Sequence, residues 1–248
     1  MRIFCCFTPA HEVLFRTVFL PSVPEGFELR ATEIPLAGPG DFLSPEFLVC
    51  IRKKIDLVVR SIGENPGKLI VWSDVDIQFF KLVPQDLEVA IEASGKDILF
   101  QRESPRMTDV NTGFFVCRCG PTVMEFFSKV HEQLGRHPGD NEQMVVNRLL
   151  EGREGAIESG EPRTQSPERE AKITWGYLPK SFYARTHGWP PPRQLAIYHA
   201  NYTKGNDGIG QKLSQFQEME GIHRGGMVAW IWSIVRRLPS RLGLARRH

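Results

Sequence analysis

The sequence has no hydrophobic run that approaches the roughly 20 residues needed to span a bilayer, and it contains no internal repeat. Its N-terminal segment is apolar but short and is stopped by Pro9, which favours a first buried strand over a signal peptide. Acidic and basic residues nearly balance, at a net charge of +2, so no overall field indicates nucleic acid as a partner. These absences favour a globular protein of the cytoplasm.

Cysteine is also scarce. The count of five is odd, and the spacing of the cysteines that lie close in sequence is not that of a zinc knuckle. We therefore expect reduced thiols in the core of a cytoplasmic protein. The five are Cys5, Cys6, Cys50, Cys117 and Cys119.

Strand-like and helix-like segments alternate along most of the 248 residues. The clearest helix is expected over residues 44–62, where Ser44 can cap the N-terminus and Pro45 suits the first turn. Further helices are expected over residues 122–134 and 140–150. Apolar or alternating runs predict strands at residues 2–7, 27–34, 68–76, 96–103, 111–118, 173–178 and 195–201.

This order of segments predicts an α/β fold, with a mixed but mostly parallel sheet flanked by helices in a single domain. We place the domain at residues 1–222. Within it, residues 151–172 are charged and rich in glycine and proline, so we expect a mobile loop there. Residues 223–248 are expected to form a basic amphipathic tail.

Two aspartates one residue apart close the apolar run at residues 68–76. On a strand, Asp74 and Asp76 point to the same face, roughly 6–7 Å apart along a backbone that rises about 3.3 Å per residue. The C-terminal edge of a parallel sheet is where ligands bind in open α/β folds. Like charges so close need a cation, and carboxylate oxygens select Mg²⁺ or Mn²⁺. A solvated strand end without a ligand is the alternative.

A polar segment follows the strand expected at residues 195–201. His199 is a candidate third metal ligand, since Mn²⁺ accepts imidazole together with carboxylates, and a structural histidine is the alternative. Glycines such as Gly205 allow a backbone to approach phosphate closely, and Lys204 and Lys212 supply point charges.

Two further segments carry polar groups at the start of an expected element. Asn111 and Gly113 begin a strand, where an amide can hydrogen-bond a sugar hydroxyl, and an ordinary turn is the alternative. Asp140, Glu142 and Gln143 lie in a first helical turn. We expect Asp140 to cap this helix, and the acidic turn would also favour a developing cation or hydroxyl groups nearby.

The order of four segments, "WSDVD", "NTGFFVCR", "DNEQMVVN" and "HANYTKG", resembles the nucleotide-diphospho-sugar transferases of the GT-A fold. The likeness covers most of residues 1–212 and is nearest to the group with a strand-borne Asp-x-Asp, an Asn-Thr-Gly segment and a late histidine. It implies that Asp74, Asp76 and His199 bind a divalent metal, and that Asp74 also lies near the ribose.

The same resemblance implies roles for the remaining candidates. These are Thr8 and a basic residue within residues 51–54 at the nucleotide, Lys212 or Lys204 with Gly205 at the diphosphate, Asn111 and Gly113 in the sugar pocket, and Glu142 and Gln143 beside the anomeric carbon, with Asp140 as a further catalytic candidate.

A metal and a lysine would stabilise the negative charge of a leaving UDP or GDP. We therefore expect a Mn²⁺- or Mg²⁺-dependent glycosyltransferase that moves a sugar from a UDP- or GDP-sugar to a saccharide or lipid-linked acceptor, in surface polysaccharide or glycolipid synthesis. Relatives of this type usually retain the anomeric configuration. One alternative is a metal-dependent phosphohydrolase or nucleotidyltransferase, although the further acids that it needs are missing near Asp74. A non-catalytic nucleotide-sugar-binding module is the other.

The end of the chain contains no acid after Glu220. Trp230 and Trp232 lie in an apolar segment that we expect to be helical over residues 227–237. Five arginines stand within or after it, namely Arg236, Arg237, Arg241, Arg246 and Arg247. Two readings of this tail stay open. One is an interfacial anchor on the anionic inner face of a membrane, and the other is a core-packed last helix with a solvated basic end.

Overall fold

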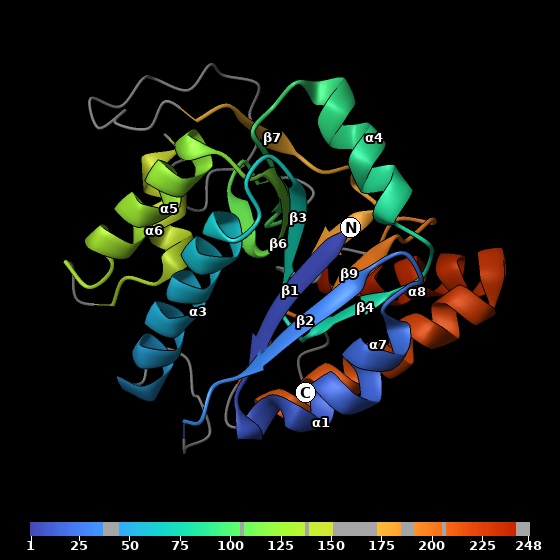
Figure 1. Cartoon of the computed structure of the whole chain (residues 1–248). Coiled ribbons are helices and arrows are strands. Elements are labelled where there is room, and N and C mark those ends of the chain that lie inside the picture. Colours follow the sequence, from blue (N-terminus) through green and yellow to red (C-terminus); the bar gives the residue numbers. More distant parts are fainter. Residues whose placement is uncertain are drawn as a thin grey trace.

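A six-stranded sheet is the centre of the structure, a computed structural model that describes residues 1–36, 45–104, 107–136, 139–150, 173–184, 191–204 and 207–241 (Figure 1). The strands lie in the order β2-β1-β3-β6-β5-β7. Five of these six run in one direction, and β6 is antiparallel to both of its neighbours. The predicted mixed, mostly parallel sheet is thus confirmed. The strands are β1 (Arg2–Phe7), β2 (Glu28–Glu33), β3 (Leu69–Ser73), β5 (Ile98–Arg102), β6 (Val110–Arg118) and β7 (Trp175–Tyr177).

A second sheet of three short strands lies at the end of β3. Its order is β4 (Ile77–Phe79), β9 (Ile197–His199) and β8 (Phe182–Ala184). Because β3 ends at Ser73 and β4 begins at Ile77, Asp74 and Asp76 lie in a bend between two different sheets. The prediction that one strand continues to Asp76 is therefore wrong, because the chain leaves the first sheet for the second at this point.

Three helices cover one face of the large sheet, and all three were predicted. They are α3 (Pro45–Gly63), α5 (Pro121–Gln133) and α6 (Glu142–Leu149), seen beside one another in Figure 1. Ser44, the predicted cap of α3, lies outside the described residues. At α6 the prediction of Asp140 as the cap is wrong: Asn141 caps the helix by accepting a hydrogen bond from the backbone N–H of Met144 at 2.9 Å.

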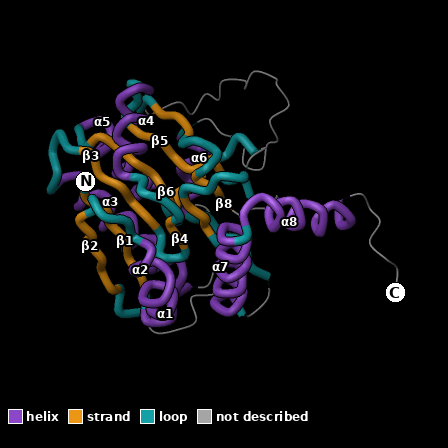
Figure 2. The backbone as a smooth tube through the Cα atoms, turned by 90° about the vertical axis from the view of Figure 1, so that its right-hand side faces the viewer, coloured by secondary structure: helices purple, strands orange, loops and turns teal. Residues whose placement is uncertain are grey.

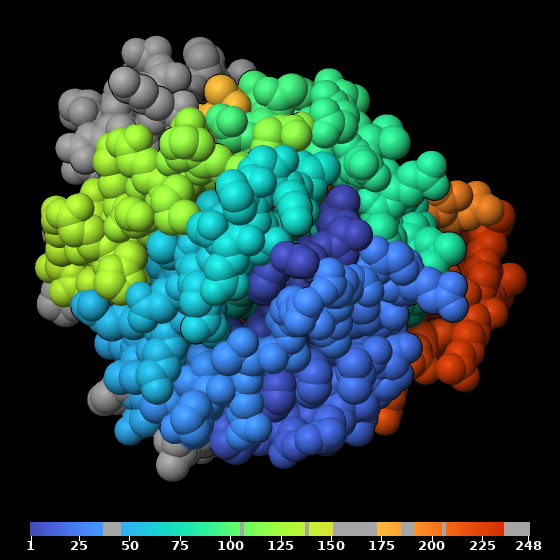
Figure 3. Space-filling view, viewed as in Figure 1, coloured from blue at the N-terminus to red at the C-terminus, as the bar shows by residue number. Residues whose placement is uncertain are grey.

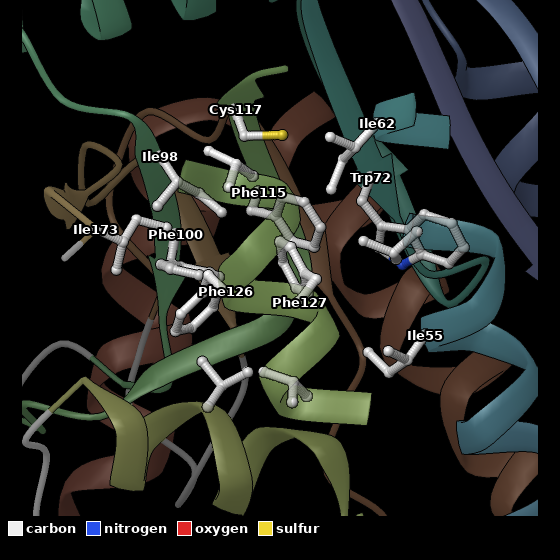
Figure 4. Close-up of a cluster of buried hydrophobic side chains, with 14 of the residues drawn as sticks. Ile55, Ile62, Trp72, Ile98, Phe100, Phe115, Cys117, Phe126, Phe127 and Ile173 are labelled. Carbon is white, nitrogen blue, oxygen red and sulfur yellow. The ribbon is translucent and has the colours of Figure 1, made fainter. Parts of the chain in front are cut away.

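Each face of the sheet carries its own apolar core, because successive residues of a strand point to opposite sides. Trp72 packs with Phe115, Phe127 and the three helices on one side (Figure 4), whereas Val71 packs on the other side. All five cysteines are free thiols, and Cys5, Cys117 and Cys119 are buried, in agreement with the expected core thiols.

The second core is covered by α4 (Pro84–Ser94), by the small sheet and by a helical segment that follows β1. This segment joins a 3₁₀ turn (Pro9–His11), α1 (Glu12–Leu14), a π-helical turn (Phe15–Phe19) and α2 (Leu20–Ser22). Phe15 and Phe19 insert into the core and stack on each other. The sequence analysis predicted neither α4 nor this segment.

The last helices described are α7 (Gly208–Arg224) and α8 (Gly226–Arg241). Gly226 has a φ of +62°, a left-handed conformation that glycine adopts without a steric penalty, and it starts α8 in a new direction. Figure 2 shows α8 extending away from the rest of the chain. Within the described part of the chain, no helix has both the length and the apolar character that crossing a membrane requires. The loop expected at residues 151–172 is outside that part.

Candidate active site

Asp74, Asp76 and His199 form one cluster, in which each residue offers a ligand atom and these atoms all lie within 4.8 Å of one another. Backbone pairing builds the cluster. The N–H of Asp74 donates to the carbonyl of Gly113 on β6 at 2.7 Å, and the N–H of Ala200, just after β9, donates to the carbonyl of Asp76 at 2.9 Å. The bend between the two sheets therefore brings the two carboxylates together with the histidine.

Gly113 lies against this cluster at an irregular part of β6. The register between β5 and β6 shifts between Phe100 and Gln101, so that the segment around Gly113 bulges out of the ladder. Any side chain at Gly113 would overlap the ring of His199 and approach a carboxylate oxygen of Asp74. The glycine predicted for the sugar pocket is thus also required for space beside the metal-ligand candidates.

Lys54 on α3 joins the two acidic parts of the site. Its ammonium lies 2.8 Å from a carboxylate oxygen of Asp74 and 2.8 Å from one of Glu142. Burial alone would lower the pKa of Lys54, but attraction and hydrogen bonding by both carboxylates outweigh it and raise the pKa above its ordinary value. The buried lysine therefore stays charged and holds Asp74 and Glu142 together.

The two aspartates differ in their electrostatic surroundings. Burial and the neighbouring charge of Asp76 raise the pKa of Asp74, although Lys54 opposes the shift. Burial would also raise the pKa of Asp76, but Lys212 on α7 and His199 outweigh it and hold this pKa well below its usual range. The ammonium of Lys212 hydrogen-bonds one oxygen of Asp76, and Nε2 of His199 lies 3.2 Å from the other.

Thr8 lies directly after β1 and contacts a histidine that the sequence analysis did not select. The Thr8 hydroxyl and Nδ1 of His11 are 2.9 Å apart. Burial, and then Lys212, lower the pKa of His11, and both Asp76 and Asp74 act on it in the opposite direction. The 3₁₀ turn after β1 is therefore within electrostatic range of the acidic cluster.

Glu103 is a second residue that the sequence analysis missed, and three amide side chains converge on it. Asn111 donates to it at 2.5 Å, Gln143 at 3.0 Å and Asn201 at 3.3 Å. These amides come from β6, α6 and the segment after β9, which are distant in sequence. Glu103 thus joins Asn111 and Gln143, two of the predicted sugar-site residues, into one hydrogen-bonded group.

The remaining candidates lie apart from the cluster or outside the described residues. Asp140 pairs with Arg148 of α6 at 2.8 Å. The side chain of Lys204 is exposed, and its ammonium lies 5.6 Å from the ring centre of Tyr202. Gly205 is not among the described residues, so the pairing of Lys204 with Gly205 stays a prediction.

One signal for Lys54 was present in the sequence. The sequence analysis expected some basic residue of residues 51–54 to reach the nucleotide but did not choose among them. Lys54 lies between Ile51 and Val58 on the apolar face of α3, where a lysine would be costly without partners. Glu103 and His11 carry no comparable signal, because their neighbours in sequence do not indicate their partners.

The mostly parallel sheet with one reversed strand defines an α/β fold, and solved glycosyltransferases have a similar fold. A glycosyltransferase involved in glycosylation of the major capsid of PBCV-1 matches with a TM-score of 0.56 at 14% identity, over 87% of this chain and 98% of the other. GlyE of Streptococcus pneumoniae TIGR4 matches with a TM-score of 0.52 at 10% identity, over 97% of this chain and 63% of the other.

The sequence itself gives the family. The chain belongs to the nucleotide-diphospho-sugar transferases, whose family profile matches residues 26–216. This range includes the cluster of Asp74, Asp76 and His199, and it also includes Lys54 and Lys212. A search of curated proteins finds no match to the sequence.

Proposed function

We propose that the protein is a metal-dependent glycosyltransferase that moves a sugar from a UDP- or GDP-sugar to a hydroxyl acceptor. The observation that carries this proposal is the convergence of Asp74, Asp76 and His199 at one point, within a chain of the nucleotide-diphospho-sugar transferase family. Lys212 lies beside the same point and supplies a positive charge for a diphosphate.

The residues of the cluster fit a divalent cation. Two carboxylates and an imidazole suit Mn²⁺. Mg²⁺ prefers oxygen ligands, so it would be bound mainly by the two carboxylates. The low pKa of Asp76 keeps this carboxylate ionised at neutral pH, as a metal ligand must be. When bound, such an ion would neutralise the negative charge that develops on the leaving diphosphate.

The side chains around the cluster have separate roles in this proposal. Lys212 contacts the diphosphate and stabilises it as the sugar leaves. Thr8 and His11 lie on the nucleotide side, and Asp74 orients the ribose. His11 bonds Thr8 and is close enough to Lys212 and Asp76 for both to act on its pKa, which supports placing the nucleotide beside this turn.

At the sugar end, we assign Asn111 and Gly113 to the pocket and Gln143 to the face of the anomeric carbon. The acceptor hydroxyl attacks that carbon from the face of the leaving group, the bond to the diphosphate breaks, and the hydroxyl proton passes to the leaving diphosphate. We propose that the configuration is retained, with the amide of Gln143 stabilising the positive charge that develops on the sugar. Lys54 links the metal and nucleotide end of the site to its sugar end, because it binds both Asp74 and Glu142.

A phosphohydrolase with two metals would need a second group of acids near the first. Among the described residues, Asp74, Asp76 and His199 are the one group of three or more ligating side chains that could hold an ion. This observation favours transfer over two-metal hydrolysis. A nucleotide-sugar-binding module without activity would show the same binding but no product.

The test is a panel of nucleotide sugars with and without Mn²⁺. The correct donor should raise the melting temperature only with the metal, because a ligand that binds the folded state stabilises it. Product analysis with saccharide and lipid-linked acceptors then separates a transferase from a binding module. Asp76→Ala should lose the Mn²⁺-dependent stabilisation but keep its fold. Release of sugar and nucleotide without any transfer would favour the hydrolase instead.

We further propose that α8 holds the enzyme at an anionic membrane surface, which would suit a lipid-linked acceptor of surface polysaccharide or glycolipid synthesis. One side of α8 is tied to the domain, since the indole N–H of Trp230 donates to the carbonyl of Pro191 at 3.0 Å and Ser233 is buried. The other side exposes Met227, Val228, Ile231, Trp232 and Val235.

The charge around this helix complements an anionic surface. No acid follows Glu220, whereas Arg224, Arg236, Arg237 and Arg241 lie along α7 and α8. Basic residues near an anionic membrane contribute about 1 kcal/mol each, in addition to the burial of apolar side chains. Figure 3 shows the orange-red residues of α8 at the right-hand margin of the molecule, where such a surface can reach them.

A further inference from the structure

Gln101 is a buried polar side chain whose position stability alone does not explain. It lies on β5 and is fully buried, and its Oε1 is 2.9 Å from Nδ1 of His199. Its Nε2 is also buried and has no hydrogen-bond partner among the described residues. A methionine would fill similar space without an unsatisfied donor, so the glutamine has a reason other than packing.

The hydrogen bond to His199 has a direction. A carbonyl oxygen accepts and cannot donate, so Nδ1 must carry the hydrogen when Oε1 faces it. A neutral imidazole carries one hydrogen, and its other nitrogen then presents a lone pair. That nitrogen is Nε2, which lies 3.2 Å from Oδ1 of Asp76. Two electron pairs at this separation favour a cation between them, which is a proton on Nε2 in the metal-free protein and the metal ion when it is bound.

We propose that Gln101 is a positioning residue that fixes His199 in the tautomer with hydrogen on Nδ1, so that Nε2 can bind the metal. The opposite orientation of the amide would donate to Nδ1 and move the hydrogen to Nε2. His199 would then donate to Asp76 and could not act as a ligand. This inference rests on the proposed metal site and adds the residue that keeps its histidine in the binding form.

The backbone keeps both partners in place. The register shift between β5 and β6 occurs directly before Gln101, and such irregularities redirect side chains. Cε1 of the His199 ring also packs against Gly113, which leaves no room for a β-carbon. His199 thus contacts both a backbone surface and one hydrogen-bond acceptor.

The first test reads the tautomer without any metal. Nitrogen-15 NMR of the imidazoles distinguishes the two neutral tautomers, and His199→Gln identifies the signal of His199. We expect Nδ1 of His199 to carry hydrogen in the parent protein, in the neutral imidazole or in the imidazolium that pairs with Asp76. In Gln101→Met the neutral Nε2–H tautomer should gain population, because the acceptor for Nδ1–H is lost. A parent protein with hydrogen on Nε2 alone would overturn the proposal.

The second test measures binding of Mn²⁺ alone by electron paramagnetic resonance. Gln101→Met should weaken binding about 10- to 100-fold, the usual effect of removing the partner of a metal-bound histidine. Gln101→Glu keeps an acceptor for Nδ1–H and should bind Mn²⁺ within a few-fold of the parent protein. Unchanged affinity in folded Gln101→Met would contradict the role.

Asn65→Leu is the matched control. Asn65 is another buried amide, which binds Arg2 and the carbonyl of Ser61. Its loss should lower thermal stability but leave Mn²⁺ affinity and the His199 tautomer unchanged. The two tests also separate the inference from the proposed function, since the tautomer of His199 is read without donor, acceptor or metal.

Discussion

A β-carbon on Gly113 would overlap Cε1 of His199, at a separation below the 3.0 Å that real β-carbons essentially never cross. The two residues belong to different sheets, since Gly113 is on β6 and His199 ends β9. The same β-carbon would lie 2.9 Å from an oxygen of Asp74. The contact between the two sheets at the metal-ligand candidates therefore depends on a missing side chain.

Gly113→Ala should consequently displace His199. Overpacking of a well-filled site costs about 1–3 kcal/mol of stability, and Mn²⁺ binding should fall more than stability does. The measurements are urea unfolding and Mn²⁺ titration. Gly221→Ala on α7 is the control, because no atom lies within 4 Å of the β-carbon it would add, and alanine favours a helix. Normal Mn²⁺ affinity in Gly113→Ala would show that the histidine is not needed as a ligand.

Lys54→Met should destabilise the fold, because it leaves the buried Glu142 and the half-buried Asp74 without their shared cation. Removing one partner of a buried ion pair costs about 3–5 kcal/mol, measured as the free energy of unfolding at pH 8. Without the lysine, nothing offsets the burial and the neighbouring charge of Asp76 that raise the pKa of Asp74 in the folded state. Protonation of Asp74 then favours folding, so the deficit should shrink as the pH falls from 8 to 5.

The control for this prediction is Lys53→Met on the same helix. Lys53 is half-buried, whereas the ion pairs of Asp74 and Glu142 described above are made by Lys54. The stability of Lys53→Met should stay within about 0.5 kcal/mol of the parent protein at both pH values. A pH-independent deficit in Lys54→Met would mean that lost packing, not unpaired charge, is the cause.

Lys212→Met and Lys204→Met decide which lysine meets the diphosphate. Lys212 lies against Asp76, whereas Lys204 is exposed beside Tyr202. A charge-assisted hydrogen bond contributes about 1.5–3 kcal/mol, so Lys212→Met should weaken UDP or GDP binding roughly 10- to 100-fold. Calorimetry in the presence of Mn²⁺ measures it. The reverse order of effects would assign the diphosphate to Lys204.

Gln143→Ala should lower kcat more than it raises KM, because the amide is assigned to the reacting carbon and not to the nucleotide. Glu142→Gln is the companion variant, since it keeps the shape of the side chain but weakens its pairing with Lys54. Steady-state kinetics with the donor found in the panel provides the comparison. Weaker binding of UDP or GDP at unchanged kcat would place Gln143 at the nucleotide.

For α8, Ile231→Ser combined with Trp232→Ser should reduce sedimentation with anionic vesicles. The parent protein should bind these vesicles, less at high salt, and should not bind neutral ones. Val89→Ser on α4 is the control, because Val89 is 60% exposed and α4 lies elsewhere on the domain. Equal sedimentation of the parent protein, the double variant and Val89→Ser would exclude the anchor. If the parent protein instead self-associates and the double variant does not, the exposed side of α8 is a contact between copies.

The local elements were predictable because their signals are local. The apolar face of α3 repeats every three to four residues, and the run before Asp74 is apolar on both faces because β3 is covered on both sides. Asp74, Asp76 and His199 were each recognised because they follow such runs. The error over the strand at Asp76 arose because the same apolar pattern continues into β4, so the sequence does not mark the change of sheet.

By itself, then, the sequence determined the six strands of the large sheet and β9, the helices α3, α5, α6 and α8, and the residue types that could hold a metal. The tertiary structure decided which charged and polar groups meet. Lys54 and Asp74 are 20 residues apart, Gln101 and His199 are 98 apart, and Lys212 and Asp76 are 136 apart. No neighbour in sequence specifies such a pair, because the contact forms only when two elements pack at a given register and orientation. The free energy that sets this packing comes from the apolar cores, including the cluster that packs α7 against β9, rather than from the site.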